Sequence, residues 1–250
     1  MITDPQGTVL AVFLVFCRIG GCVLAMPGFS SARVPGMLRV FVAGGLSIAV
    51  LPVLWDTVYP AVSNPGATYI GLIFSESLIG VMYGLLARFY TLGLQFAANI
   101  IATMVGYSSP GGMDIVEDSS ETSLSGFITF AGMMILFIMD FHHIVFRALI
   151  DSYTTMPFGG IADMRANLIS LTDTLESTTY IMLRLASPFI IYSIMFNVSI
   201  GFINKLAPQI PVYFISTPYM LLGGLFLFYF SVAALISQYA QFFPSVFVGR

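Results

Sequence analysis

Long apolar stretches make up more than half of this 250-residue chain. Six of them run over residues 9–26, 38–55, 69–105, 124–139, 180–202 and 213–235. A helix needs about 20 mostly apolar residues to cross a bilayer. The stretches therefore predict an all-α, polytopic integral membrane protein built from long kinked helices and helical hairpins.

Charged side chains are too few to cover the surface of a soluble domain. Asp, Glu, Lys and Arg make up 8% of the residues, against about 25% in ordinary soluble domains. The net charge is −3 and Lys205 is the single lysine, so the chain lacks a basic patch for phosphates. We expect no nucleic-acid partner, and a surface that faces membrane lipid or other proteins.

The apolar stretches are irregular in length, and the loops do not fix their orientation. Residues 69–105 are too long for one simple span, whereas residues 124–139 are short for any span. If the loops alternate sides, four basic residues fall on each side, so the positive-inside rule assigns no orientation. This pattern is typical of a protein whose segments do not all cross the bilayer in the ordinary way.

One segment is amphipathic rather than uniformly apolar. Apolar residues recur at steps of three and four over residues 161–175, with acidic and basic residues between them. The spacing predicts an amphipathic helix over residues 161–176. Such a helix caps a bundle, lies at the membrane interface, or offers a docking face to a partner.

Two stripes of small and polar residues follow a spacing of four, which places each stripe on one helix face. The first is Glu76, Gly80, Gly84 and Arg88, and the second is Ser193, Asn197, Gly201 and Lys205. Small residues let neighbouring helices approach closely. We interpret both stripes as interhelical packing and hydrogen-bonding faces, and we expect them to pack against neighbouring subunits of an assembly.

Charges within apolar helices also raise a functional alternative. Arg18, Glu76, Arg88 and Arg184 are such charges, and Glu76 is the candidate carrier in a proton or ion path. No second carboxylate lies in register for a relay. Because Arg18 interrupts the first apolar stretch, we expect no cleaved secretory signal.

No metal site, disulfide or catalytic motif is predicted. Asp140 lies near His142 and His143, but adjacent helical residues point about 100° apart, so the pair is not expected to chelate one ion. Cys17 and Cys22 are interpreted as core residues. The sequence has no nucleotide-binding or hydrolase motif, so we expect no cofactor and no enzymatic activity.

The most polar stretch is residues 107–122, which contain four acids and no base. Pro110, Gly111 and Gly112 make its start adaptable, and Met113 adds a deformable apolar side chain before Asp114. The stretch is either an exposed loop or a re-entrant plug. From the residues alone, the exposed loop is favoured.

An ordered set of motifs resembles the FliR family of flagellar type III export-gate membrane proteins over nearly the whole chain. The most specific part of the set is Arg184, Pro188, Asn197, Gly201, Pro208-Gln209, Pro218 and Gly223. The earlier members are Arg18, Pro27 to Ser30, Val34-Pro35, Arg39, Leu51-Pro52, Glu76, Gly80, Gly84, Gln95, Gly106, His142-His143, Ser152 and Pro157 to Gly160.

The resemblance implies a core pore subunit that passes unfolded flagellar proteins across the bacterial inner membrane, at the flagellar basal body, for flagellum assembly. FliP and FliQ are the implied partners, joined by FlhB and FlhA. Residues 1–250 form one export-gate domain, FliP-like over about 1–178 and a FliQ-like hairpin over about 179–250. Residues 107–122 align with the family's plug, with Pro110 to Asp114 as its gate, which reverses the preference for an exposed loop.

Three alternatives remain open. A homologous subunit of a virulence-type secretion system is the nearest one. A small proton-coupled transporter predicts two related halves, and residues 9–105 show no such repeat in residues 124–235. A purely structural assembly scaffold differs from the gate only in lacking a pore-lining surface.

Overall fold

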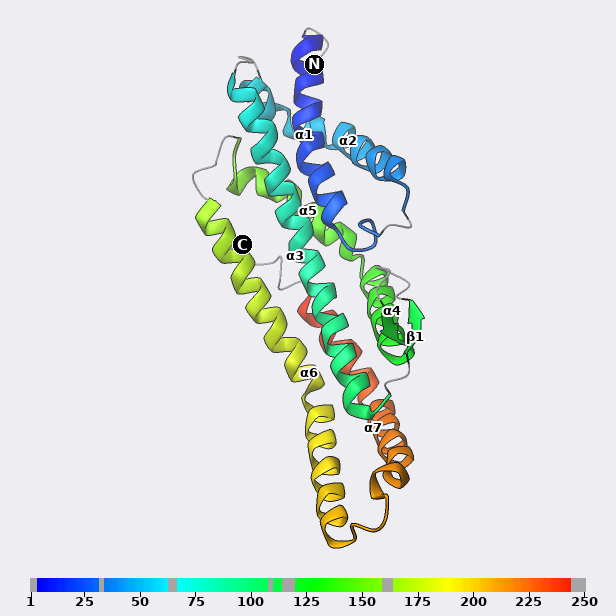
Figure 1. The fold of residues 1–250 in the computed structure, drawn as a ribbon. Coiled ribbons are helices and arrows are strands. Elements are labelled where there is room, and N and C mark those ends of the chain that lie inside the picture. The colour runs from blue at the N-terminus through cyan, green and yellow to red at the C-terminus, as the bar shows by residue number, and fades with distance from the viewer. Residues whose placement is uncertain are drawn as a thin grey trace. The chain divides into compact units, whose positions relative to one another are not determined.

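The computed structural model describes residues 4–31, 34–62, 67–107, 110–113, 120–158 and 164–243. Figure 1 shows the fold, whose elements in chain order are α1 (Pro5–Ala25), α2 (Gly36–Val62), α3 (Ala67–Val105), β1 (Pro110–Met113), β2 (Ser120–Thr122), α4 (Ser123–Ile138), α5 (Phe141–Thr155), α6 (Met164–Leu206) and α7 (Val212–Phe242). The fold is helical apart from β1 and β2, which form a short antiparallel ribbon.

Five helices in the described part of the chain are long and apolar enough to cross a membrane. They are α1, α2, Tyr69–Val105 in α3, Leu168–Leu206 in α6, and α7. The bent pair α4 and α5 makes a sixth if the two helices form one span. The predicted class, a helical multi-pass membrane protein, is confirmed.

Helix α6 joins two segments that the sequence pattern treats separately. The amphipathic residues 161–176 and the apolar residues 180–202 belong to one helix from Met164 onward, and residues 161–163 lie outside the described part. No glycine or proline lies between Met164 and Pro188. The helix therefore runs on, because nothing in this interval breaks its hydrogen-bond ladder.

The chain divides into two compact units, each assembled from segments distant in sequence. One comprises residues 1–89, 140–175 and 244–250, and the other comprises residues 90–139 and 176–243. This division follows contacts within the chain. The implied boundary near residue 178 follows a likeness to two other proteins, and it stays a prediction.

The first unit is held by close approach of α1 to α3. A Cβ atom added at Gly21 meets the Ser77 carbonyl oxygen at 2.6 Å, and one added at Gly84 meets the Cys22 carbonyl oxygen at 2.6 Å. Only glycine allows the two backbones to lie this close.

Asp4 caps the N-terminus of α1, because its carboxylate accepts a hydrogen bond from the Gly7 amide at 3.0 Å. This bond lowers the pKa of the Asp4 carboxyl from its ordinary value.

The second unit packs residues 90–105 of α3 against α4 and α7. The rings of Tyr90 and Tyr239 stack with centroids 4.8 Å apart, and the Tyr90 hydroxyl donates to the Tyr239 backbone carbonyl. A Cβ atom added at Gly224 meets Val105 Cγ1 at 2.6 Å. Glycine and aromatic residues thus set the helix spacing in this unit as well.

Helices α6 and α7 bury little of their apolar surface within the chain. Half of the most apolar window of α1 is buried, but only 22% of that of α6 and 11% of that of α7. Large exposed side chains of α7 include Phe214, Leu222, Phe226, Tyr229 and Phe230. These faces are suited to contact lipid or other membrane-embedded protein.

Candidate functional site

A fully buried ion pair joins α1 to α3 in the first unit. Arg18 Nε lies 2.6 Å from Glu76 Oε2, and Arg18 Nη2 donates to Glu76 Oε1 at 2.8 Å. Both side chains are 0% exposed. The planar guanidinium therefore meets both carboxylate oxygens at once, which is the strongest arrangement for such a pair.

Helix α5 and the residues after it complete the surroundings of Arg18. Arg18 Nη1 donates to Ser152 Oγ at 3.0 Å, and Nη2 donates to the Met156 carbonyl at 3.1 Å. The guanidinium carbon lies 3.8 Å from the Tyr153 ring centroid, within cation–π distance. Arg18 thus links three elements, and its charge is matched by an opposite charge and by acceptors.

Both carboxylate oxygens of Glu76 are engaged by Arg18 in this structure. A relay carboxylate exchanges protons with water or with a second acid, whereas both oxygens of Glu76 face a guanidinium that is fully buried. The geometry favours the packing interpretation of this charge over the proton-path alternative.

The rest of the first stripe lies along the same helix. A Cβ atom added at Gly80 collides with the Arg18 carbonyl oxygen, and Gly84 lies against Cys22 and Ala25. Arg88, at the end of the stripe, is half-buried. The helix that meets Gly80 and Gly84 is α1 of the same chain, so these two glycines pack within the chain and not against a neighbouring subunit.

The second stripe has a different environment. Ser193 is buried, and Asn197 Nδ2 donates within α6 to the Ser193 carbonyl at 2.8 Å. An added Cβ atom at Gly201 meets no atom of the described residues within 4 Å, and Lys205 is exposed. Arg184, on the same helix, is exposed as well. The described residues leave this end of α6 uncovered.

The proline motif between α1 and α2 forms a tight connection. Pro27 is buried, Gly28 adopts a φ of 85°, and Pro35 precedes the first residue of α2. Arg39 Nη2 donates to the Ser31 carbonyl and, at 3.0 Å, to the Val34 carbonyl. Arg39, in the first turn of α2, therefore holds the connection by hydrogen bonds to its backbone.

The prolines of the C-terminal half mark exposed positions. Pro188 lies inside α6 and Pro218 inside α7, while Pro208 and Gln209 occupy the turn between these helices. All four residues are exposed. Their role is therefore not to fill the core of this chain.

The predicted gate segment forms the short ribbon. Pro110 pairs with Thr122, Gly112 with Glu121, and Met113 with Ser120. Gly111 lies within β1, at the irregularity in the register. Asp114 lies outside the described residues. The sequence pattern did not predict strands here, because a proline, two glycines and a methionine show no alternation of apolar and polar residues.

Asp140, His142 and His143 lie closer together than the helix argument allows. One ligand atom from each lies within 4.8 Å of the others, and His143 Nδ1 is 3.6 Å from Asp140 Oδ1. Asp140 has a φ of 56° just before α5, which turns its carboxylate back over the first helical turn. These three residues could supply ligands to one ion, and the absence of a metal site stays a prediction.

The sequence pattern indicated Arg18 and Glu76 as functional candidates, but it did not predict that they form an ion pair with each other. The available signal was that two opposite charges, each in an apolar helix, need partners. Ser152 and Tyr153 gave no such signal, because a serine and a tyrosine near the end of an apolar segment are common.

Comparisons with known proteins show the family of the chain. The sequence profile of "Bacterial export proteins, family 1" matches residues 9–246. The chain is 27% identical over 222 residues to the flagellar biosynthetic protein FliR of Caulobacter vibrioides, covering 89% of this chain and 88% of that protein. It is 24% identical to FliR of Escherichia coli, covering 94% and 87%, and 22% identical to FliR of Aquifex aeolicus, covering 95% and 91%. With a match that reaches into every helix described above, this chain belongs to family 1 of the bacterial export proteins, the FliR family.

Proposed function

We propose that this protein is a component of the flagellar protein export apparatus and serves as a core pore subunit of its export gate. It assembles with FliP and FliQ, is joined by FlhB and FlhA, and passes unfolded flagellar proteins across the bacterial inner membrane at the basal body. It performs no catalysis and uses no cofactor. The relatives named flagellar biosynthetic protein FliR support the flagellar assignment over the virulence-type sibling.

The observation that carries the assembly role is the bare surface of α6 and α7. Helices that bury 22% and 11% of their most apolar windows lack a complete set of neighbours within the described chain. Helices of partner subunits would complete this surface. The buried Arg18–Glu76 pair joins α1 to α3 within the first unit, and the proposed role needs this unit folded.

The second stripe gives a direct test of assembly. Gly201→Leu places a bulky side chain where the described residues leave open space. We expect the chain to fold with an unchanged unfolding temperature, but to recover at least fivefold less FliP and FliQ on affinity purification, because a leucine separates packed helices. Gly45→Leu in α2, a helix whose apolar window is also 22% buried and where an added Cβ atom meets no atom within 4 Å, shows whether the loss is specific to the second stripe. Normal recovery of both partners with Gly201→Leu contradicts the docking role of this stripe.

The gating role of residues 110–114 rests on the family resemblance. Deleting Pro110 to Asp114 is expected to raise ion leak across membranes that carry the assembled complex, because the deletion removes β1 and with it the ribbon. Conductance in reconstituted bilayers measures the leak, and co-purification of FliP and FliQ shows that the complex still forms. An intact complex with unchanged conductance argues against a plug at this position.

The transporter alternative is less favoured by the geometry. Its candidate carrier, Glu76, is paired with Arg18 and fully buried. Solute uptake by vesicles that contain the purified chain alone would restore it.

A further inference from the structure

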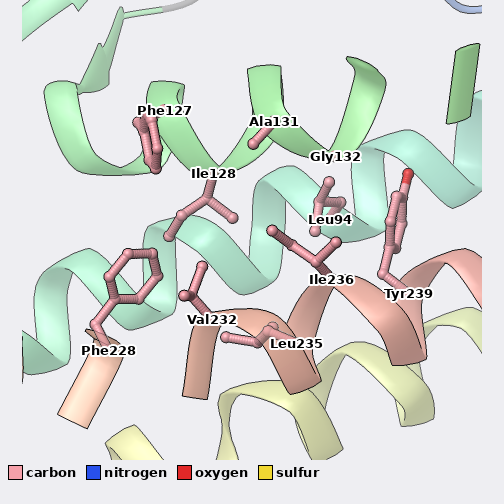
Figure 2. Close-up of a pocket in the computed structure, with 10 residues that line it drawn as sticks. All are labelled: Leu94, Phe127, Ile128, Ala131, Gly132, Phe228, Val232, Leu235, Ile236 and Tyr239. Atoms are coloured by element: carbon pink, nitrogen blue, oxygen red, sulfur yellow. The ribbon is translucent and has the colours of Figure 1, made fainter. Parts of the chain in front are cut away.

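The apolar pocket of the second unit is too small for a ligand. Figure 2 shows Leu94 of α3, Ile128 of α4 and Val232 of α7 around it. The space that these residues leave is about 20 Å³, which is little more than one water molecule requires. This pocket therefore belongs to the packing of the unit and is not a binding site.

Three side chains with metal-binding atoms converge at the start of α5, in the first unit. Asp140 Oδ1 lies 3.9 Å from His142 Nε2 and 3.6 Å from His143 Nδ1. One ligand atom from each residue lies within 4.8 Å of the other two. Around one tetrahedral Zn²⁺ ion, with bonds of about 2.0–2.1 Å, ligand atoms are about 3.4 Å apart. Small rotations of these side chains therefore bring all three atoms to a common ion.

The backbone at Asp140 keeps its carboxylate available to a cation. Among the described residues, Asp140 is the only non-glycine residue with a positive φ, which is 56°. An aspartate that precedes a helix usually accepts a hydrogen bond from an amide of the first turn, but the Asp140 side chain makes no such bond. Strained backbone of this kind occurs most often at functional sites and ligand clamps. The carboxylate is thus directed toward the two imidazoles and not toward the helix amides.

The two imidazoles stand on a fixed backbone. Phe141 and Val145, which flank them on α5, are both 0% exposed and anchor the first turn of the helix. The His142 ring packs edge-on against the Phe141 ring, with centroids 5.9 Å apart, and its centroid lies 4.3 Å from that of His143. His143 is 74% exposed and His142 is 31% exposed. The imidazoles can therefore turn toward one ion from solvent while the helix stays in place.

We propose that Asp140, His142 and His143 form a binding site for one Zn²⁺ ion. Asp140 supplies an oxygen ligand, each histidine supplies one ring nitrogen and keeps its proton on the other, and water fills the fourth position. Two nitrogens and one oxygen suit Zn²⁺ better than Mg²⁺ or Ca²⁺, which prefer oxygen ligands. The N-terminal end of α5 carries a partial positive charge, and the Asp140 carboxylate supplies the negative charge that a cation needs at this position.

This proposal is the opposite of the sequence-based prediction that the chain has no metal site. That prediction rested on the directions of adjacent helical residues, which differ by about 100°. These directions do not limit how closely the ring nitrogens of two long side chains approach each other. The ion is not a cofactor of export. It ties Asp140 to the first turn of α5, within the first unit, and it requires no partner subunit.

Metal binding to the full-length protein in detergent tests the site. The chain contains two histidines, and both lie in the site, so the protein is purified with a histidine-free affinity tag and treated with a chelator. We expect equilibrium dialysis to show one Zn²⁺ per chain, which an excess of Mg²⁺ does not displace. Co²⁺ bound in its place should give a visible spectrum of nitrogen and oxygen ligation. Zn²⁺ should also raise the unfolding temperature, because it binds the folded chain. Absence of stoichiometric Zn²⁺ binding overturns the proposal.

Two variants assign the binding to these residues. His143→Ala removes an exposed ligand, and Asp140→Asn removes the charge while keeping a residue that tolerates the left-handed conformation. Each should weaken Zn²⁺ binding by at least about tenfold and abolish the Zn²⁺-dependent rise in unfolding temperature. Asp151→Asn, at an exposed aspartate of the same helix, is the matched control and should bind as the parent does. If His143→Ala does not fold, Asp140→Asn decides, and unchanged affinity in that variant overturns the site.

Discussion

Glu76→Gln is expected to remove a large share of the folding stability of this chain. The substitution leaves the Arg18 guanidinium charged and fully buried without its counter-ion, and breaking a buried pair in this way costs about 3–5 kcal/mol. Folded domains are stable by only about 5–15 kcal/mol. We therefore expect a low yield of folded protein, a much lower unfolding temperature in detergent, and loss of motility in cells that depend on the variant.

The control for this change is Glu176→Gln. Glu176 is an exposed glutamate of α6, and surface substitutions usually change stability by no more than about 0.5 kcal/mol. The two variants alter net charge equally, so a difference between them reports the buried pair. Equal unfolding temperatures for the two would mean that the Arg18–Glu76 contact does not hold the first unit together.

A double substitution separates packing from proton transfer at the same position. Replacing a buried ion pair by apolar residues of similar volume is often neutral for stability, so Arg18→Met with Glu76→Met should regain much of what Glu76→Gln loses. Some loss remains, because the Met156 carbonyl no longer receives the Arg18 donor. If motility returns together with stability, the pair is structural. A folded, assembled and inactive double variant would instead favour the proton-carrier alternative.

The fold class could be predicted from the sequence because the length of an apolar stretch can be counted within one segment, without knowledge of its contacts. A run such as residues 69–105 is read directly from the chain, and the structure forms α3 over nearly the same residues. The residues at which helices end are harder to predict from the sequence. The amphipathic pattern over residues 161–176 suggested a separate element, but hydrophobic periodicity records which face is apolar and does not record where a helix stops.

The candidate site was only partly accessible, because it depends on contacts between distant segments. Arg18 and Glu76 are 58 positions apart, and Arg18 and Ser152 are 134 apart. Spacing by four placed Gly80 and Gly84 on one face of a helix, but it did not say which helix covers them. The Asp140 turn shows the complementary problem: a single positive φ changes the local geometry without any mark in the helical pattern.

Gly80→Ala is the second substitution for which a large effect is expected. The added methyl group collides with the Arg18 carbonyl oxygen and lies 2.8 Å from its carbonyl carbon. These are backbone atoms of α1, and the Arg18 side chain is held by Glu76, Ser152 and Met156. Neither partner can yield easily, so α1 and α3 must move apart.

Separation of these helices affects every close contact along the interface. Overpacking typically costs about 1–3 kcal/mol, and the Arg18–Glu76 geometry is strained at the same time. Gly45→Ala in α2 is the matched control, because an added Cβ atom there meets nothing within 4 Å. It should stabilise the protein by up to about 1 kcal/mol through helix propensity alone. Thermal unfolding of the two variants in the same detergent should therefore shift in opposite directions.

Combining Gly80→Ala with Glu76→Gln tests whether the two contacts form one interface. Independent sites add their free-energy changes, whereas residues that share a contact do not. Once Gly80→Ala has moved α3 away from α1, Glu76 no longer meets Arg18 in its native geometry. The ion pair then contributes less stability, so Glu76→Gln causes a smaller further loss. We expect the loss in the double variant to be smaller than the sum of the single losses by at least about 1 kcal/mol. Full additivity would mean that the glycine contact and the ion pair stabilise the chain separately, and that α1 and α3 are not joined as one rigid element.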